Sequence, residues 1–323
     1  TIFFGGGTPS LMKDRTVYEI LQNIHNLWKI TPEVEITLEA NPTSTEKETF
    51  SSYHCSGVNR LSLGVQAFHD ADLKRLGRLH NSKEAKEAIG VATNLFKRVS
   101  FDLMYGRQYQ TLSNWEKELQ TAIEFSTEHL SLYQLTIEKG TRFGDLLSKN
   151  KLRGLPNDVL SRNFYIHTQD ICEASGLQGY EISNHAILGK ECRHNINYWN
   201  SGCYLGIGPG AHGRLNIGLE RFRTEAPESP EVWLDAINKN DIKFFIKEPL
   251  TFTERAEEYA IASIRLRSGM DMKIFQELSG TNISANTLSL LLSNDFITID
   301  GNKLKTTSKG KLMTNQILRE ILC

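Results

Sequence analysis

The sequence predicts an α/β protein in which parallel strand–helix units come first and a smaller, winged-helix-like α+β module follows. Within the first 135 residues, five short apolar runs alternate with amphipathic stretches, and this alternation is typical of parallel βα units. After about residue 215, prolines interrupt the chain and the pattern changes to helices followed by a hairpin. We therefore predict two domains, 1–215 and 216–323, in a chain long enough for one large and one small core.

The first part of the chain supplies the strands and their covering helices. Its apolar runs predict strands at 1–4, 35–40, 60–65, 99–104 and 129–135, with one more at 179–183. Helical patterns fall at 14–28, 72–76, 82–96, 113–125 and 158–175. Parallel sheets and barrels of this type bind ligands at the carboxyl ends of their strands.

The second part supplies the smaller module. It predicts helices at 253–267, 274–278 and 284–292, a hairpin of 296–300 and 303–306, and a last helix to residue 322. A winged-helix pattern can indicate DNA binding, but the charges here are mixed and no helix is strongly basic. Because 37 basic residues nearly balance 38 acidic ones, we expect no nucleic-acid partner.

The chain carries no recognisable targeting or membrane signal. No run approaches 18 apolar residues, so no transmembrane segment is expected. No signal peptide opens the chain, which favours the cytoplasm. Thr1 is followed at once by the apolar residues of a strand. We therefore expect that a natural front segment is missing from this sequence or that the gene is shortened.

The cysteines are few and scattered. They show no CxxC spacing, which argues against a disulfide framework or a zinc ribbon and favours free thiols. The five cysteines are Cys55, Cys172, Cys192, Cys203 and Cys323.

Polar residues stand at the ends of four successive predicted strands. The glycines after the first strand allow close approach of a charged ligand to the backbone, although they also suit a tight turn. Glu39 ends the second strand, where a carboxylate can accept from an amine or ribose, or cap the turn before Pro42. Gln66 ends the third strand, and Arg78 follows twelve residues later.

Asp102 belongs to the fourth predicted strand. A buried aspartate requires a partner, either a backbone group or an arginine. Because the four strands deliver their polar groups to one rim, the sequence predicts a site for a polar small molecule there.

These segments together resemble the radical S-adenosylmethionine (SAM) family, in the branch of oxygen-independent coproporphyrinogen oxidases and HemW-like heme chaperones. The matching motifs are FGGGTPS at 4–10, EANP at 39–42, RLSLGVQ at 60–66, FDL at 101–103 and YLGIGPGAHG at 204–213. The resemblance implies a partial (β/α)6 radical SAM barrel whose first βα unit is missing. It also implies a SAM site formed by Gly6, Gly7, Thr8, Glu39, Gln66, Arg78 and Asp102.

The segment HNINYW at 194–199 resembles the HNxxYW signature of HemW-like heme chaperones. An imidazole can ligate iron and flat rings can pack against a porphyrin. The resemblance therefore implies that His194, Tyr198, Trp199 and His212 contribute to heme binding. By themselves the residues also suit a core in which His194 is hydrogen-bonded, and Cys192 or Cys203 are alternative ligands.

Two features depart from the family pattern. The family holds a [4Fe–4S] cluster through a CxxxCxxC segment, and this sequence has no such spacing. We therefore expect the cluster only in a full-length parent. The loop at 106–111 reads GRQYQT where the family usually has Gly-Leu-Pro-Gly-Gln-Thr, so its turn is expected to differ.

The implied function is that of a HemW-like heme chaperone. Such a protein binds heme, a cluster and SAM, and passes the heme to an acceptor protein that the sequence does not identify. The alternatives are an oxygen-independent coproporphyrinogen III oxidase, which decarboxylates propionate side chains through a SAM-derived radical, and a non-catalytic remnant of either.

Overall fold

The structure is a computed structural model that describes residues 1–125, 127–241 and 246–322. It forms two compact units, Thr1–His194 and Asn195–Cys323. The division falls within helix α9 (Arg193–Trp199), and the domain division predicted at residue 215 stays a prediction.

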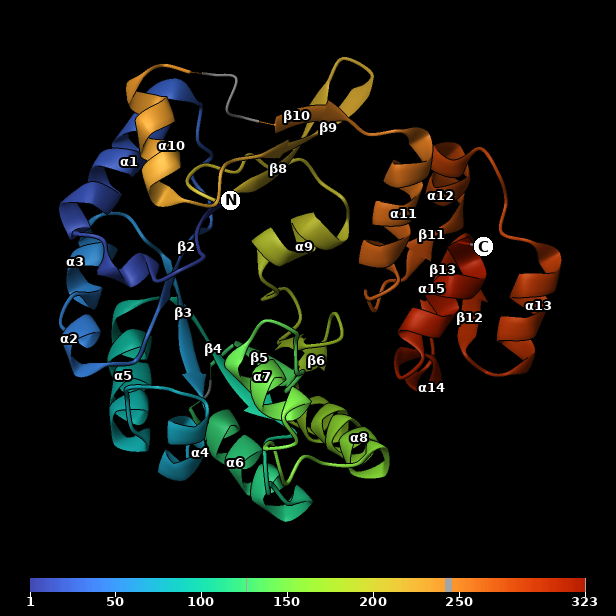
Figure 1. Cartoon of the computed structure of the whole chain (residues 1–323), viewed down its shortest axis with the longest axis horizontal. Coiled ribbons are helices and arrows are strands. Elements are labelled where there is room, and N and C mark those ends of the chain that lie inside the picture. Colours follow the sequence, from blue (N-terminus) through green and yellow to red (C-terminus); the bar gives the residue numbers. More distant parts are fainter. Residues whose placement is uncertain (126, 242–245, 323) are drawn as a thin grey trace. The chain divides into compact units, whose positions relative to one another are not determined.

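A seven-stranded sheet forms the first unit (Figure 1). Its strands lie in the order β1-β2-β3-β4-β5-β7-β6, and β1 to β5 are parallel neighbours. Their bounds are Ile2–Phe4, Ile36–Ala40, Arg60–Gln66, Arg98–Tyr105, His129–Gln134, Asn184–Ala186 (β7) and Gln178–Gly179 (β6). The five predicted parallel strands, and with them the α/β fold class, are confirmed.

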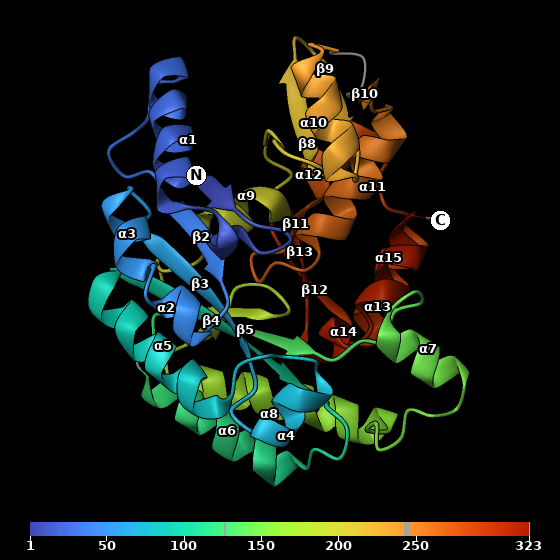
Figure 2. The ribbon, with the colours of Figure 1, turned by 60° about the vertical axis from the view of Figure 1, so that its left-hand side comes forward.

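Figures 1 and 2 show the longer helices of this unit arranged along one face of the sheet. The helices are α1 (Asp14–Leu27), α2 (Ser44–Lys47), α3 (Phe50–Cys55), α4 (Asp70–Arg75), α5 (Ser82–Leu95), α6 (Leu112–Glu124), α7 (Arg142–Ser148) and α8 (Asp158–Ala174). A short 3-10 turn, Pro9–Leu11, follows β1.

The strand residues alternate between two environments. Leu61, Leu63, Phe101 and Leu103 are fully buried in the core that includes residues of the covering helices. The residues between them in β3 and β4 are mainly polar. Because successive side chains of a strand point to opposite faces, the face away from the core is lined by polar groups.

The strand predicted at 179–183 is wrong except for Gly179, which ends β6. Residues 180–183 form the turn of a hairpin between β6 and β7, closed by a hydrogen bond from Tyr180 N–H to the Asn184 carbonyl of 3.1 Å. The Glu181 carboxylate accepts from Ser183 N–H at 2.8 Å and from the Asn184 amide at 2.6 Å. These local hydrogen bonds favour the turn over an extended strand.

The second unit contains two small antiparallel sheets. One has the order β10-β9-β8, formed by Ile246–Pro249, Glu220–Glu225 and His212–Ile217, with helix α10 (Pro230–Asn238) between β9 and β10. The other has the order β11-β13-β12, formed by Met270–Asp271, Lys303–Thr306 and Ile297–Asp300. Helices α11 (Phe252–Ser263), α12 (Met272–Ser279), α13 (Ala285–Ser293), α14 (Ser308–Lys311) and α15 (Thr314–Leu322) accompany this sheet.

The second of these sheets and its helices share one apolar core, which includes Ala260, Phe275, Leu291 and Leu304. Three helices precede the β12–β13 hairpin, as the winged-helix-like pattern predicted. Among the residues that the structure describes, no helix has both the length and the apolar character that crossing a membrane requires.

Candidate functional site

The loop after β1 and the end of β2 meet at the carboxyl edge of the parallel sheet. Gly6 and Gly7 have φ angles of +76° and +56°, in the left-handed region that favours glycine. The Gly6 N–H donates to Glu39 Oε2 at 3.3 Å. The structure therefore brings together the predicted loop and the predicted carboxylate.

Asp102 lies on the polar face of β4, next to Ser131 of β5 in the strand register. Its side chain is partly accessible but largely enclosed by protein, and this loss of hydration raises the pKa of its carboxyl to about 7. A hydrogen bond from Ser131 opposes the rise, and the charge of Glu39 adds to it. A carboxyl with this pKa changes its charge near neutral pH.

Glu39, Arg78 and Asp102 belong to one electrostatically coupled group. Burial raises the pKa of the Glu39 carboxyl, while the Gly6 N–H and the charge of Arg60 lower it. Burial lowers the pKa of the Arg78 guanidinium, while Asp102 raises it. These charge interactions place Glu39, Arg78 and Asp102 near one another, and their role as a ligand site stays a prediction.

Arg60 is a member of this group that the sequence did not single out. Its side chain is buried, and Nη2 donates to Ser100 Oγ at 2.8 Å. Ser100 Oγ in turn donates to Ser62 Oγ at 3.1 Å. The alternation of polar and apolar residues in RLSLGVQ was the signal that could have revealed this polar face.

Gln66, the last residue of β3, has an unusual backbone. Its φ angle is +71°, a conformation that side chains other than glycine seldom adopt. Its carbonyl accepts from Arg107 Nη1 at 3.3 Å, and the strand register shifts between Leu63 and Gln66. Such conformations persist where the surroundings hold them, and Arg107 supplies part of that support.

Arg107 anchors the loop after β4 in a buried network. Its guanidinium pairs with Glu118 of α6 at 2.5 Å and with Asp72 of α4 at 3.2 Å, and only 4% of its side chain is exposed. It also donates to the Met104 carbonyl at 2.9 Å. Glu118 accepts from Phe68 N–H at 2.6 Å, so one ion pair joins the loops that follow β3 and β4.

The GRQYQT loop keeps a left-handed residue without a second glycine. Tyr109 has a φ angle of +60°, and its N–H donates to the Gly154 carbonyl at 2.7 Å. The guanidinium of Arg75 lies 5.4 Å from the centre of its ring. A Cβ atom on Gly154 would come within 2.5 Å of that ring, so the glycine there leaves room for the tyrosine.

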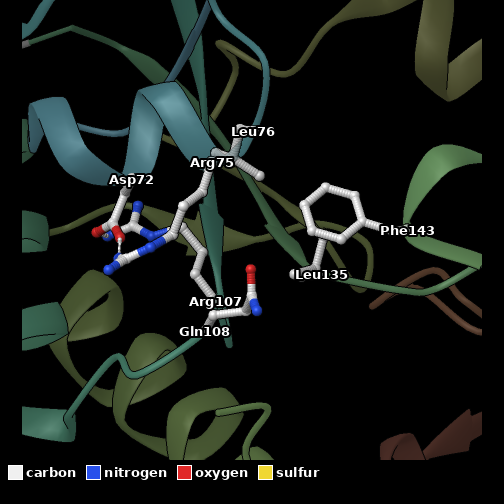
Figure 3. A pocket seen from close by; sticks show the side chains of 7 residues that line it. All are labelled: Asp72, Arg75, Leu76, Arg107, Gln108, Leu135 and Phe143. Atoms are coloured by element: carbon white, nitrogen blue, oxygen red, sulfur yellow. Dashed lines mark hydrogen bonds and ion pairs between the residues drawn. The ribbon is translucent and has the colours of Figure 1, made fainter. Parts of the chain in front are cut away.

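A small pocket opens beside this network (Figure 3). Its lining comes from α4, the loop after β4, the end of β5 and α7, and combines charged, amide and apolar side chains. The lining residues are Asp72, Arg75, Leu76, Arg107, Gln108, Leu135 and Phe143.

His194 is fixed against the first strand. Its imidazole stacks on Phe3 with ring centroids 4.5 Å apart and planes 19° from parallel. Its Nδ1 atom lies 3.2 Å from Thr1 Oγ1. Burial lowers the pKa of the imidazole to about 4, so the ring is neutral at physiological pH.

The other three predicted heme residues belong to the second unit. The Tyr198 ring lies 4.2 Å from that of Tyr204, and the Arg265 guanidinium lies 4.7 Å from the Trp199 ring. The His212 side chain is 59% exposed, with Nδ1 4.0 Å from a Glu225 carboxylate oxygen. The predicted heme residues are thus divided between the two units, with His194 in the first.

The described residues do not fit an iron–sulfur cluster. Among them, no group of three or more His, Cys, Asp or Glu side chains is arranged to hold a metal ion. Cys55, Cys172, Cys192 and Cys203 form no disulfide bond, and Cys323 lies outside the described residues. By contrast, Glu39 and Asp102 are carboxylates that lie near one another, and such groups can bind a ligand that carries positive charge.

Comparisons with known proteins agree with this geometry. Residues 1–122 match the model of the radical SAM superfamily. The heme chaperone HemW of Haemophilus influenzae is 35% identical over 326 residues, an alignment that covers all of this chain and 82% of that protein. The mitochondrial radical S-adenosyl methionine domain-containing protein 1 of Dictyostelium discoideum is 36% identical, with 100% and 80% covered.

The fold also has a counterpart among solved structures. Coproporphyrinogen III oxidase (HemN) from Escherichia coli matches with a TM-score of 0.78 over 99% of this chain and 76% of that protein, at 18% identity. That identity supports the fold alone. The relatives and this shared fold together confirm the resemblance that the sequence showed. Membership of the radical SAM superfamily implies SAM and a [4Fe–4S] cluster. Because a relative of 35% identity aligns with the whole chain, this protein belongs to the HemW heme chaperone family of the radical SAM superfamily.

Proposed function

We propose that this protein is a cytoplasmic heme chaperone, which binds heme and passes it to an acceptor protein. The observation that carries the proposal is the HNINYW segment, which forms helix α9 and begins with a histidine already held by an aromatic ring. His194 is proposed as an iron ligand, and Tyr198, Trp199 and His212 as further heme contacts. The names of the HemW relatives support the heme assignment.

We further propose that the carboxyl edge of the sheet binds SAM. The loop residues Gly6, Gly7 and Thr8 offer backbone groups to its amine, and Glu39 and Asp102 offer carboxylates to its positive charges. Gln66 and Arg78 complete the set, with Arg78 suited to the SAM carboxylate. SAM supplies the radical chemistry of this family once a reduced cluster is present. Within the described part of the chain, no group of His, Cys, Asp or Glu side chains is arranged to hold that cluster.

The family resemblance of the sequence leaves one alternative activity, the oxidation of coproporphyrinogen. That activity decarboxylates propionate groups, whereas a chaperone releases heme unchanged. Incubation with coproporphyrinogen, SAM and a reductant, followed by mass spectrometry, separates the two. Loss of two carbon dioxide molecules per porphyrinogen would replace the chaperone proposal.

The chaperone proposal predicts that His194→Ala weakens heme binding. Loss of an iron ligand should lower heme affinity by at least about tenfold and shift the Soret band. Heme titration followed by absorption spectroscopy measures both, with Cys203→Ser as the control for ligation by the nearby exposed thiol. An unchanged affinity and spectrum in His194→Ala, with a loss in Cys203→Ser, would assign the iron to the thiol instead.

A further inference from the structure

We propose that Glu35 and Arg98 are positioning residues for His194, and that together they hold the start of helix α9 in the orientation that heme binding requires. This inference rests on the proposed heme function. Neither residue belongs to a sequence motif of the family resemblance, and both lie far from His194 in the sequence.

Glu35 accepts hydrogen bonds from the first N–H groups of helix α9. Only 3% of its surface is exposed, and its Oε1 atom accepts from Arg193 N–H at 3.0 Å and from His194 N–H at 3.3 Å. The Cys192 thiol lies 3.7 Å from the same oxygen. The first N–H groups of a helix have no acceptor within the helix, so this buried carboxylate fixes where α9 begins.

Arg98 holds the segment that leads into the helix. Its Nη1 forms an ion pair with Glu35 Oε2. Its Nη2 donates to the carbonyls of Lys190 and Glu191 at 2.7 and 2.9 Å. One guanidinium therefore joins the carboxylate that receives the helix to the backbone just before it, and its planar geometry restricts how that backbone lies.

The side chain of His194 is fixed as well as its backbone. Its ring is stacked on Phe3, and Phe3 and Thr37 are paired neighbours in the β1–β2 register. Glu35 is joined to the same strand pair by the hydrogen bond from Ile2 N–H to the Glu35 carbonyl at 2.8 Å. Backbone and ring are thus anchored to one rigid edge of the sheet.

These contacts have a functional meaning because a metal ligand works in one orientation. Mutation of the groups that orient a ligating histidine typically lowers metal affinity by about 10- to 100-fold. A chaperone must also release its heme. A histidine that protein contacts hold in place keeps its position after the heme has left, whereas one held only by its bond to iron does not. The Glu35–Arg98 pair provides that fixed place.

The test is a double-mutant cycle in heme affinity between Glu35→Gln and His194→Ala. Glutamine keeps one acceptor oxygen but removes the charge that pairs with Arg98. We expect Glu35→Gln to weaken heme binding about tenfold and to shift the Soret band. In the His194→Ala background the same substitution should have no further effect, because it acts through the histidine.

Two further variants keep the test decisive. Thr168→Val removes the buried hydrogen bond from Trp115, which is 2.8 Å long and belongs to the α6–α8 contact. It should lower stability without changing heme affinity. Phe3→Leu removes the stacking ring without touching the Glu35 network and should also weaken heme binding. It replaces Glu35→Gln as the test variant if that variant does not fold.

The outcomes separate this inference from the proposed function. A loss in His194→Ala with no change in folded Glu35→Gln and Phe3→Leu would overturn the positioning role alone. Additive losses in the double mutant would overturn it too, since they indicate independent effects. If His194→Ala leaves heme affinity unchanged, the ligand assignment fails and the positioning role fails with it.

Discussion

SAM affinity should rise between about pH 6 and about pH 8, and Asp102→Asn should remove this dependence. In the protein without ligand, the Asp102 carboxyl has a pKa of about 7. A ligand with an ammonium and a sulfonium group favours the ionised carboxylate, so binding must displace a proton below that pH. In the asparagine variant this carboxyl can no longer exchange a proton, and affinity above neutral pH should fall by about tenfold or more.

Over the same pH range, the free energy of unfolding should fall as the pH rises. Burial raises the pKa of the Asp102 carboxyl above its unfolded value of about 3.9, so ionisation disfavours the folded state. The stability contributed by this group is therefore full below about pH 4 and is lost as the pH rises to about 7. Asp102→Asn should accordingly be more stable than the parent above neutral pH.

These opposite signs make the prediction decisive. Isothermal titration calorimetry with SAM, at several pH values and in buffers of different ionisation enthalpy, reports both the affinity and the proton released. S-adenosylhomocysteine, which lacks the sulfonium charge, is the matched control and should show a weaker pH dependence. A SAM affinity that is independent of pH in the parent would remove Asp102 from the proposed site.

Replacing Arg107 by methionine should destabilise the first unit by about 3–5 kcal/mol. The substitution leaves the carboxylates of Glu118 and Asp72 without their shared cation in a buried position. It also removes the donor to the Gln66 carbonyl, whose backbone is in an unfavourable conformation. Urea unfolding followed by circular dichroism measures the free energy of unfolding.

An exposed ion pair of the second unit gives the control for this effect. Arg223 pairs with Glu248, and their side chains are 45% and 51% exposed. Arg223→Met should therefore cost only about 0–1 kcal/mol. Adding Glu118→Gln to Arg107→Met should recover part of the lost stability, because the uncompensated buried charge is removed. A loss below about 1 kcal/mol in Arg107→Met would mean that water replaces the guanidinium.

Local sequence pattern determined much of the fold and part of the candidate site. The apolar runs gave the five parallel strands because strand period and burial are encoded over a few residues. The residues Gly6, Glu39 and Asp102 were predictable as neighbours because parallel strands end at one edge. The hairpin around Gly301 followed from its turn residues.

Other features depended on partners distant in the sequence. Helix α9 was not predicted, and the acceptor for its first N–H groups, Glu35, lies more than 150 residues earlier. Most of the strand predicted at 179–183 is a turn, which the hydrogen bonds of Glu181 stabilise. The loop at 106–111 holds its left-handed Tyr109 by contacts with Gly154 and Arg75.

The sequence alone thus determined the order of the five parallel strands with their longer helices, and the chemical character of the sheet edge, since both arise from periodicity and residue type. Only the tertiary structure decided which charges are neutralised: Arg107 by Glu118 and Asp72, and Glu35 by Arg98. The physical reason is that desolvation and ion pairing depend on distances through space, which the folded chain sets between residues that its sequence keeps far apart.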